Sequence, residues 1–265
     1  MSQLLSQIID QIRTDYLALM EQKNGSNPYI SAEMLCNDKL YLDADTLAQV
    51  VGQDPTLLAA RGGNLIFNAE EKQNPSVGMI ICANIVAAML EGLVEMALDK
   101  GWLSADDDGR LVIDAEELSQ PEPAVLSVDY SQSETAKNNL SQRSASGLSL
   151  ILGNAEAAFV DQLSEEQHDA YSLALQVASE YSVFSPDDIS PLVAENPLLL
   201  GLRADGLVDE ELFEGDPPAG LIISAHLTQM ILNQLLELAV EHGALGVDSS
   251  GHPLLPERTE KPALH

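Results

Sequence analysis

The densest group of residues that could carry chemistry is an acidic stretch that begins at Ser104 and reads SADDDGRLVIDAEEL. If Gly109 takes the sixth position of a calcium-binding loop, the oxygen side chains from Ser104 to Asp108 supply its first, third and fifth positions. The twelfth position, where such a loop needs a bidentate glutamate, is Ala115. We therefore interpret this stretch as the acidic tip of a turn and predict no metal ion.

Four polar residues interrupt two otherwise apolar helical segments, and they form two pairs with the same spacing. The pairs are Asn84 with His226 and Glu95 with Glu237, so the numbers in each pair differ by 142. If the two glutamates were buried at an interface, their pKa values would rise, and the pair would suit a metal or a proton relay. Such glutamates more often lie at the solvated end of a long helix, which we favour. We keep all four residues as candidate polar positions between the repeats.

The histidines do not form a recognisable catalytic or metal-binding motif. The five histidines lie at positions 168, 226, 242, 252 and 265, without HxxxH or HExxH spacing. The sequence also lacks a nucleophile elbow, a P-loop and a GxGxxG motif. We therefore predict that the protein is not an enzyme and has no catalytic residue, no cofactor and no metal. An enzyme with a site between two repeats remains an alternative.

The segment TLAQVVGQDPTLLAAR resembles a helix-turn-helix, with Ala48 and Gly52 at the spacing of its tight turn. A recognition helix needs cationic or amide side chains for phosphates and base edges, but this one offers little beyond Arg61. The chain also has a net charge of −30, which repels nucleic acid. We favour a structural role and predict no direct nucleic-acid binding. A helix-turn-helix-derived regulator, or a nucleic-acid mimic, remains an alternative.

Two long helices must position these residues. Residues 77–100 and 219–242 are apolar nearly all the way round, which is typical of buried helices. A membrane span needs about 20 apolar residues with few charges, whereas Asn84, Glu91 and Glu95 interrupt the first segment. We predict two soluble core helices and no membrane partner.

The two segments belong to a longer internal similarity at a constant offset of 142 in the numbering, which continues without gaps from about residue 43 to residue 113. Identical pairs include Pro55/Pro197, Leu58/Leu200, Arg61/Arg203, Gly78/Gly220, Ile81/Ile223, Leu93/Leu235, Gly101/Gly243 and Asp106/Asp248. We interpret this as a duplication whose halves pack with pseudo-twofold symmetry. Small residues in the first long helix would let the second long helix approach closely.

The predicted fold is mostly α, with two tandem copies of a helical domain in which a long buried helix precedes a short β-hairpin. Gly101 and Gly243 end the long helices, while Asp45 and Asp54 are expected to cap the preceding short ones. The predicted domains are residues 1–113 and residues 147–255. A linker rich in Ser, Gln and Asn spans 114–146, and a disordered tail spans 256–265.

Composition points to a partner rather than a reaction. The 42 acidic residues outnumber the 12 basic ones, which favours basic partners. Cys36 and Cys82 have no CxxC spacing, and no signal peptide is predicted, so we expect a cytoplasmic protein. We predict an acidic protein-interaction module, such as an adaptor, chaperone or inhibitor, that engages a basic partner. The sequence does not predict its oligomeric state.

Overall fold

The computed structural model describes nine segments of the chain: residues 2–22, 27–40, 42–62, 74–106, 108–112, 147–164, 169–204, 216–248 and 252–254. This part of the chain is 74% helical and contains no β-strand, so the predicted mostly-α class is confirmed. The predicted linker, 114–146, and the predicted tail, 256–265, lie outside the described residues.

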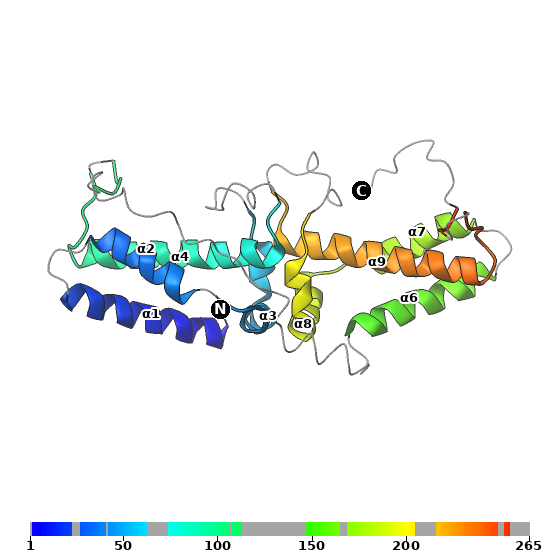
Figure 1. Ribbon diagram of the computed structural model, residues 1–265, viewed down its shortest axis with the longest axis horizontal. Coiled ribbons are helices and arrows are strands. Elements are labelled where there is room, and N and C mark those ends of the chain that lie inside the picture. The colour runs from blue at the N-terminus through cyan, green and yellow to red at the C-terminus, as the bar shows by residue number, and fades with distance from the viewer. Residues whose placement is uncertain are drawn as a thin grey trace. The chain divides into compact units, whose positions relative to one another are not determined.

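The described residues form eight α-helices and two short 3-10 helices (Figure 1). In chain order they are α1 (Gln3–Gln22), α2 (Pro28–Lys39), α3 (Ala44–Gln53), η1 (Pro55–Ala59), α4 (Val77–Asp99), α6 (Gly147–Leu163), α7 (Ala170–Glu180), α8 (Pro186–Glu195), η4 (Pro197–Gly201) and α9 (Ala219–Glu241). The bounds of α8, η4 and α9 are those of α3, η1 and α4 with 142 added to each residue number.

Short polar side chains begin several of these helices. Asp43 accepts a hydrogen bond from the Thr46 backbone N–H at the start of α3, and Ser76 accepts one from the Met79 N–H at the start of α4. The N-cap of α3 is therefore Asp43, and Asp45, which we expected to be a cap, lies inside the first turn. Asp54 occupies the N-cap position of η1 but makes no side-chain capping bond there.

The chain divides into two compact units. Unit 1 comprises Met1–Gln142 and Pro186–Ile223, and unit 2 comprises Arg143–Ser185 and Ser224–His265. Helices α1 to α4, both 3-10 helices, α8 and the first residues of α9 thus belong to unit 1.

In unit 1, α2 packs against both α4 and α1, and Figure 1 shows α1 and α2 lying along α4. Tyr16 of α1 is fully buried, and its hydroxyl donates a hydrogen bond of 3.0 Å to the Pro28 carbonyl. Its ring meets Trp102 edge-on, with 6.1 Å between the ring centroids. We expected the small residues of α4 to face the equivalent long helix, but within unit 1 α4 packs chiefly against α2.

The largest helix contact in unit 1 joins α3 to α8. Gly52 lies against Ala194, and a Cβ added at Gly52 would be only 2.8 Å from the Ala194 Cβ. The buried side chains of the two helices occupy positions whose numbers differ by 142: Leu47, Ala48, Val50 and Val51 in α3, and Ile189, Ser190, Leu192 and Val193 in α8. The two helices therefore meet through matching faces, with their smallest residues at the point of closest approach.

Two backbone hydrogen bonds beside this contact also match. The Val77 N–H donates to the Leu202 carbonyl and the Ala219 N–H donates to the Ala60 carbonyl, each over 2.8 Å. The first residue of α4 is thus bonded to the residue after η4, and the first residue of α9 is bonded to the residue after η1.

The guanidinium groups that follow the two 3-10 helices make a similar pair of contacts. Arg61 donates to the Asp216 carbonyl over 3.0 Å, and Arg203 donates to the Asn74 carbonyl. Arg61 and Arg203 differ by 142 in residue number, and so do Asn74 and Asp216.

Unit 2 contains α6, α7 and the greater part of α9, which share one hydrophobic core. Phe159 of α6 is its largest fully buried side chain, and it clusters with Leu173 and Val177 of α7 and with Ile231 and Leu235 of α9. Three helices therefore bury one face each against the others.

Each long helix ends at a glycine with a positive φ angle, 69° at Gly101 and 71° at Gly243. Glycine adopts this left-handed conformation without the Cβ clash that other residues suffer. The segments that follow contain only single antiparallel bridges, Ala105 with Leu111 and Val247 with Pro253. Within the described residues the expected β-hairpins thus appear as turns closed by one bridge, without strands.

Helices α4 and α9 are both long and apolar enough to span a membrane, by length and composition alone. The core helix of a soluble protein meets the same criteria. In α4, 56% of the most apolar window is buried within the protein, and in α9 the share is 39%.

Candidate functional site

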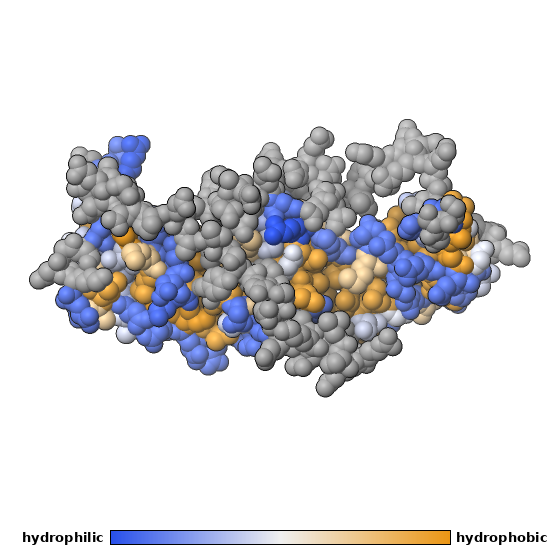
Figure 2. All heavy atoms as spheres, in the orientation of Figure 1, coloured by the Kyte–Doolittle hydropathy of each residue, from blue (hydrophilic) through white to orange (hydrophobic). Residues whose placement is uncertain are grey.

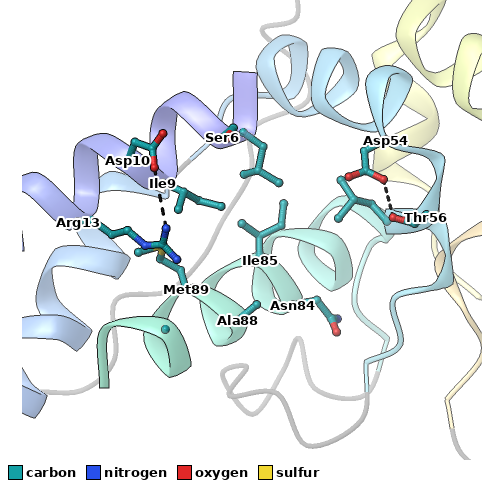
Figure 3. A pocket seen from close by; sticks show the side chains of 13 residues that line it. Ser6, Ile9, Asp10, Arg13, Asp54, Thr56, Asn84, Ile85, Ala88 and Met89 are labelled. Atoms are coloured by element: carbon teal, nitrogen blue, oxygen red, sulfur yellow. Dashed lines mark hydrogen bonds and ion pairs between the residues drawn. The ribbon is translucent and has the colours of Figure 1, made fainter. Parts of the chain in front are cut away.

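Unit 1 contains an open groove of about 620 Å³ between α1 and α4 (Figure 3). Helix α1 contributes residues 5, 6, 9, 10 and 13, and α4 contributes residues 84, 85, 88, 89 and 92. Asp54, Thr56 and Leu57 complete the lining. In Figure 3 Ile9 of α1 and Ile85 of α4 point toward one another, and Asp54 and Thr56 stand at one end.

The two helices present the same spacing to the groove, i, i+1, i+4, i+5 and i+8. Residues so spaced lie on one face of an α-helix. At 1.5 Å per residue the lined stretch is about 12 Å long, a little over two turns. The groove therefore has two helical walls that line it over similar lengths.

The floor of the groove is apolar. Leu5, Ile85 and Met89 are buried there, while Ile9 and Ala88 are more exposed. Over α1, on the left of Figure 2, hydrophobic residues show at the surface between hydrophilic ones. Burying such a surface against a partner lowers the free energy by about 25 cal/mol per Å² of apolar area.

The rim of the groove carries charge. Arg13 and Asp10 form an ion pair of 3.9 Å, and their side chains are 49% and 73% exposed. An exposed pair of this kind stabilises a protein by at most about 1 kcal/mol, so both groups stay available to a ligand. The Arg13 guanidinium lies beside Gly92, where an added Cβ would be 3.9 Å from the Arg13 Nη2.

Asp54 places a carboxylate at one end of the groove. The side chain is largely buried, and it accepts a hydrogen bond from the Thr56 hydroxyl. This hydrogen bond is the main reason why the pKa of Asp54 lies below its ordinary value. Asp54 is therefore ionised at neutral pH.

Asn84 is the one predicted site residue that lines the groove. Its side-chain amide donates to the Ile80 carbonyl over 2.8 Å and to the Arg61 carbonyl over 3.0 Å. The amide thus ties the chain that follows η1 to helix α4. Its role is to hold the wall of the groove in place.

The other three predicted positions lie elsewhere. Glu95 is an exposed residue of α4 in unit 1, and Glu237 is an exposed residue of α9 in unit 2. His226 is partly buried in the unit 2 portion of α9. The exposure of both glutamates agrees with the solvated role that we favoured for them.

The acidic turn uses its first aspartate as a hydrogen-bond acceptor. Asp106 Oδ1 accepts from the backbone N–H groups of Asp108 and Arg110, over 3.0 and 2.8 Å. Asp248 Oδ1 likewise accepts from the His252 N–H over 3.0 Å. The described residues contain no cluster of three His, Cys, Asp or Glu side chains that would hold a metal ion.

The segment that resembles a helix-turn-helix forms α3 and η1. Its second helix is a 3-10 helix of five residues, and its first helix is buried against α8. A recognition helix must be long and exposed enough to enter a major groove, and neither helix meets this requirement. The segment builds the centre of unit 1.

The two cysteines are free and buried in unit 1. Burial is the main cause that raises the pKa of each thiol to about 12. The reactive species of cysteine is the thiolate. Both thiols are therefore protonated and unreactive at neutral pH.

Sequence reasoning did not identify Asp10, Arg13 or Ala88 as site residues. These residues lie on the outer faces of helices, where polar and small side chains are expected in any soluble protein. No family model matches the chain, and neither the curated proteins nor the solved structures gave a match.

Proposed function

We propose that the protein is an acidic cytoplasmic interaction module, an adaptor, chaperone or inhibitor, that binds a basic partner protein through the α1–α4 groove. One observation carries the proposal: the groove has an apolar floor, with the Asp10–Arg13 ion pair at its rim and the Asp54 carboxylate at its end. Apolar surface supplies affinity, and charge at the edge supplies steering and specificity.

The charge of the whole chain supports a basic partner. The net charge is −30, with 42 acidic and 12 basic residues. A field of this sign accelerates encounter with a cationic protein and repels polyanions. Because the Debye length falls from about 10 Å at 0.1 M salt to about 3 Å at 1 M, binding should weaken strongly as salt rises.

We further infer that the chain arose as two fused copies of one helical unit, residues 1–113 and 147–255, related by a pseudo-twofold axis. The equal helix bounds, the paired hydrogen bonds of Val77 and Ala219, and the contact of Gly52 with Ala194 support this inference. Positions 52 and 194 are equivalent under the offset of 142, so their contact would lie on the axis. The turns after the long helices would be the remnants of equivalent hairpins.

The two alternative functions gain no specific observation within the described segments. A helix-turn-helix-derived regulator lacks a recognition helix there, and the four polar positions do not gather in one described pocket. We therefore propose neither of them.

The test is a capture experiment from native extract with the immobilised full chain, washed at low and at high salt. We expect a basic protein that is retained at low salt, released at high salt and lost with Ala88→Arg, which places a cation in the groove. The matched control is Met230→Arg, which makes the same charge change at the equivalent position of the second copy, another exposed helix position. Capture of acidic proteins only, or equal capture by both variants, would contradict the proposal.

A further inference from the structure

We propose that the groove binds an amphipathic α-helix of the partner, with an apolar stripe against the floor and a Lys or Arg beside Asp10. The bound helix would become the fourth member of a bundle with α1, α2 and α4. This inference rests on the proposed function and specifies the chemistry of the partner.

The shape of the groove supports a helical occupant. Its walls are two helices that each line it over about two turns with the same residue spacing. An amphipathic helix that lies in such a groove contacts it with residues at i, i+3, i+4 and i+7, which also span about two turns. The groove is thus matched in length to about two turns of a helical segment.

The packing of unit 1 indicates where the helix of the partner would lie. Helices α1 and α4 both pack against α2, and their direct contact with each other is slight. The groove opens between α1 and α4. Four-helix bundles place a helix in each such position around a shared apolar core.

Small residues on α4 allow the close approach that helix packing requires. Ala88 and Gly92 are one turn apart and both line the groove. Helix axes in bundles are about 8–10 Å apart, and the smallest side chains permit the shortest distances. The apolar residues of the partner helix would therefore pack over Ala88.

The charges at the rim define the sequence of the partner helix. Asp10 offers an exposed carboxylate, while Arg13, one turn further along α1, offers an exposed guanidinium beside Gly92. Opposite charges favour a cation next to Asp10, and like charges disfavour one next to Arg13. The full chain, at −30, disfavours an acidic helix altogether.

The test uses labelled synthetic peptides of about 14 residues and the full chain, followed by fluorescence anisotropy. The first peptide has Leu at i, i+3, i+4 and i+7 and Lys elsewhere. The second has Glu in place of Lys, and the third has the composition of the first in an order without an apolar face. We expect the first peptide to bind saturably and the second not to bind. The third should bind at least about tenfold more weakly than the first.

Protein variants locate the binding site. We expect Ala88→Arg to weaken binding of the first peptide by about tenfold or more, and Met230→Arg to change it by less than about twofold. We expect Asp10→Asn to weaken it by about two- to fivefold, as for one exposed ion pair. Equal effects of Ala88→Arg and Met230→Arg would overturn the proposal, because the peptide would then respond to net charge alone.

Two further outcomes separate this inference from the proposed function. If no peptide binds, but extract still yields a basic protein that Ala88→Arg loses, the groove is the partner site and the helical occupant is wrong. If the free full chain sediments as a dimer that Ala88→Arg dissociates, the occupant is a second copy of this chain. Either result would overturn the inference.

Discussion

Helices α1, α2 and α4 of unit 1 and helices α6, α7 and α9 of unit 2 have similar lengths and follow the same order, but they carry different chemistry. The three charged residues that line the groove are Asp10, Arg13 and Asp54. The residues 142 positions later in the numbering, Leu152 and Ala155 of α6 in unit 2 and Asn196 in unit 1, carry no charge. The comparison teaches that helices of similar length and order form in unit 2 with uncharged residues at positions 152 and 155.

The interiors of the two regions differ as well. Unit 1 buries Tyr16 in edge-on contact with Trp102, whereas unit 2 buries Phe159 at the centre of its core. The residues 142 positions after Tyr16 and Trp102 are Ala158 and Ala244. Each region has thus filled the space between its helices with its own aromatic side chains, which makes their stabilities separately testable.

The largest expected effect is on unit 2. Phe159→Ala removes a fully buried aromatic ring and should lower the free energy of unfolding by about 3–5 kcal/mol. Urea unfolding measures the change, and hydrogen exchange should show it in α6, α7 and α9 while α1 and α2 keep their protection. Val160→Ala, at the exposed neighbouring position, is the control. Loss of protection in α1 and α2 to the same degree would show that the two units are not separable.

The next effect belongs to unit 1, which holds both thiols. Folding raises the pKa of Cys36 and Cys82 from an ordinary value of 9.0 to about 12, so the folded state binds more protons above pH 9. The contribution of the thiols to the free energy of unfolding is therefore fully present below about pH 9. Above that pH it falls by about 1.4 kcal/mol per pH unit for each thiol. Unfolding free energies at pH 8 and pH 10 should show this loss, and Cys36→Ala should make the slope shallower. An unchanged slope would exclude the buried thiol as its cause.

A smaller effect is expected where α3 meets α8. Gly52→Val inserts a branched side chain where even a Cβ would lie 2.8 Å from the Ala194 Cβ, which should cost about 1–3 kcal/mol. Ala194→Gly in the same chain removes the Cβ atom with which the valine side chain clashes. The double variant should therefore be at least about 1 kcal/mol more stable than the sum of the single changes implies. Strict additivity would show that the two residues do not meet.

The smallest effect concerns the charge at the end of the groove. Asp54→Asn introduces the residue found 142 positions later, Asn196, and should lower the free energy of unfolding by about 1 kcal/mol at pH 7. Because folding lowers the pKa of Asp54, its contribution is present above the ordinary value of 3.8 and is lost as the pH falls below it. The wild type and the variant should therefore converge in acid, as measured by urea unfolding across the pH range. A difference that persists at pH 2 would assign the loss to packing.

The helices were predictable because their signals are local. Pro55, Pro197, Gly101 and Gly243 mark where elements begin and end, and the apolar runs between them fix the long helices. The partner of each helix was not predictable in the same way. The buried face of α3, which includes Leu47 and Val51, indicates burial but does not specify α8 as the helix that covers it.

The groove could not be predicted from the sequence because it depends on the distance between α1 and α4. Ile9 and Ala88 are ordinary residues of amphipathic or apolar helices, and only the arrangement of both helices on α2 brings them to one groove. The sequence singled out Asn84 as a polar residue in an apolar helix. Its hydrogen bonds to Ile80 and Arg61 became visible only in the structure.

The most direct measurement is hydrogen exchange of the full chain with and without the Leu/Lys peptide. If the α1–α4 groove is the partner site, the peptide should add protection in α1 and α4 of unit 1 and none in α6. This added protection should disappear in Ala88→Arg. Protection spread equally over α1 and α6, or unchanged by Ala88→Arg, would contradict a specific groove and leave only non-specific attraction to an acidic chain.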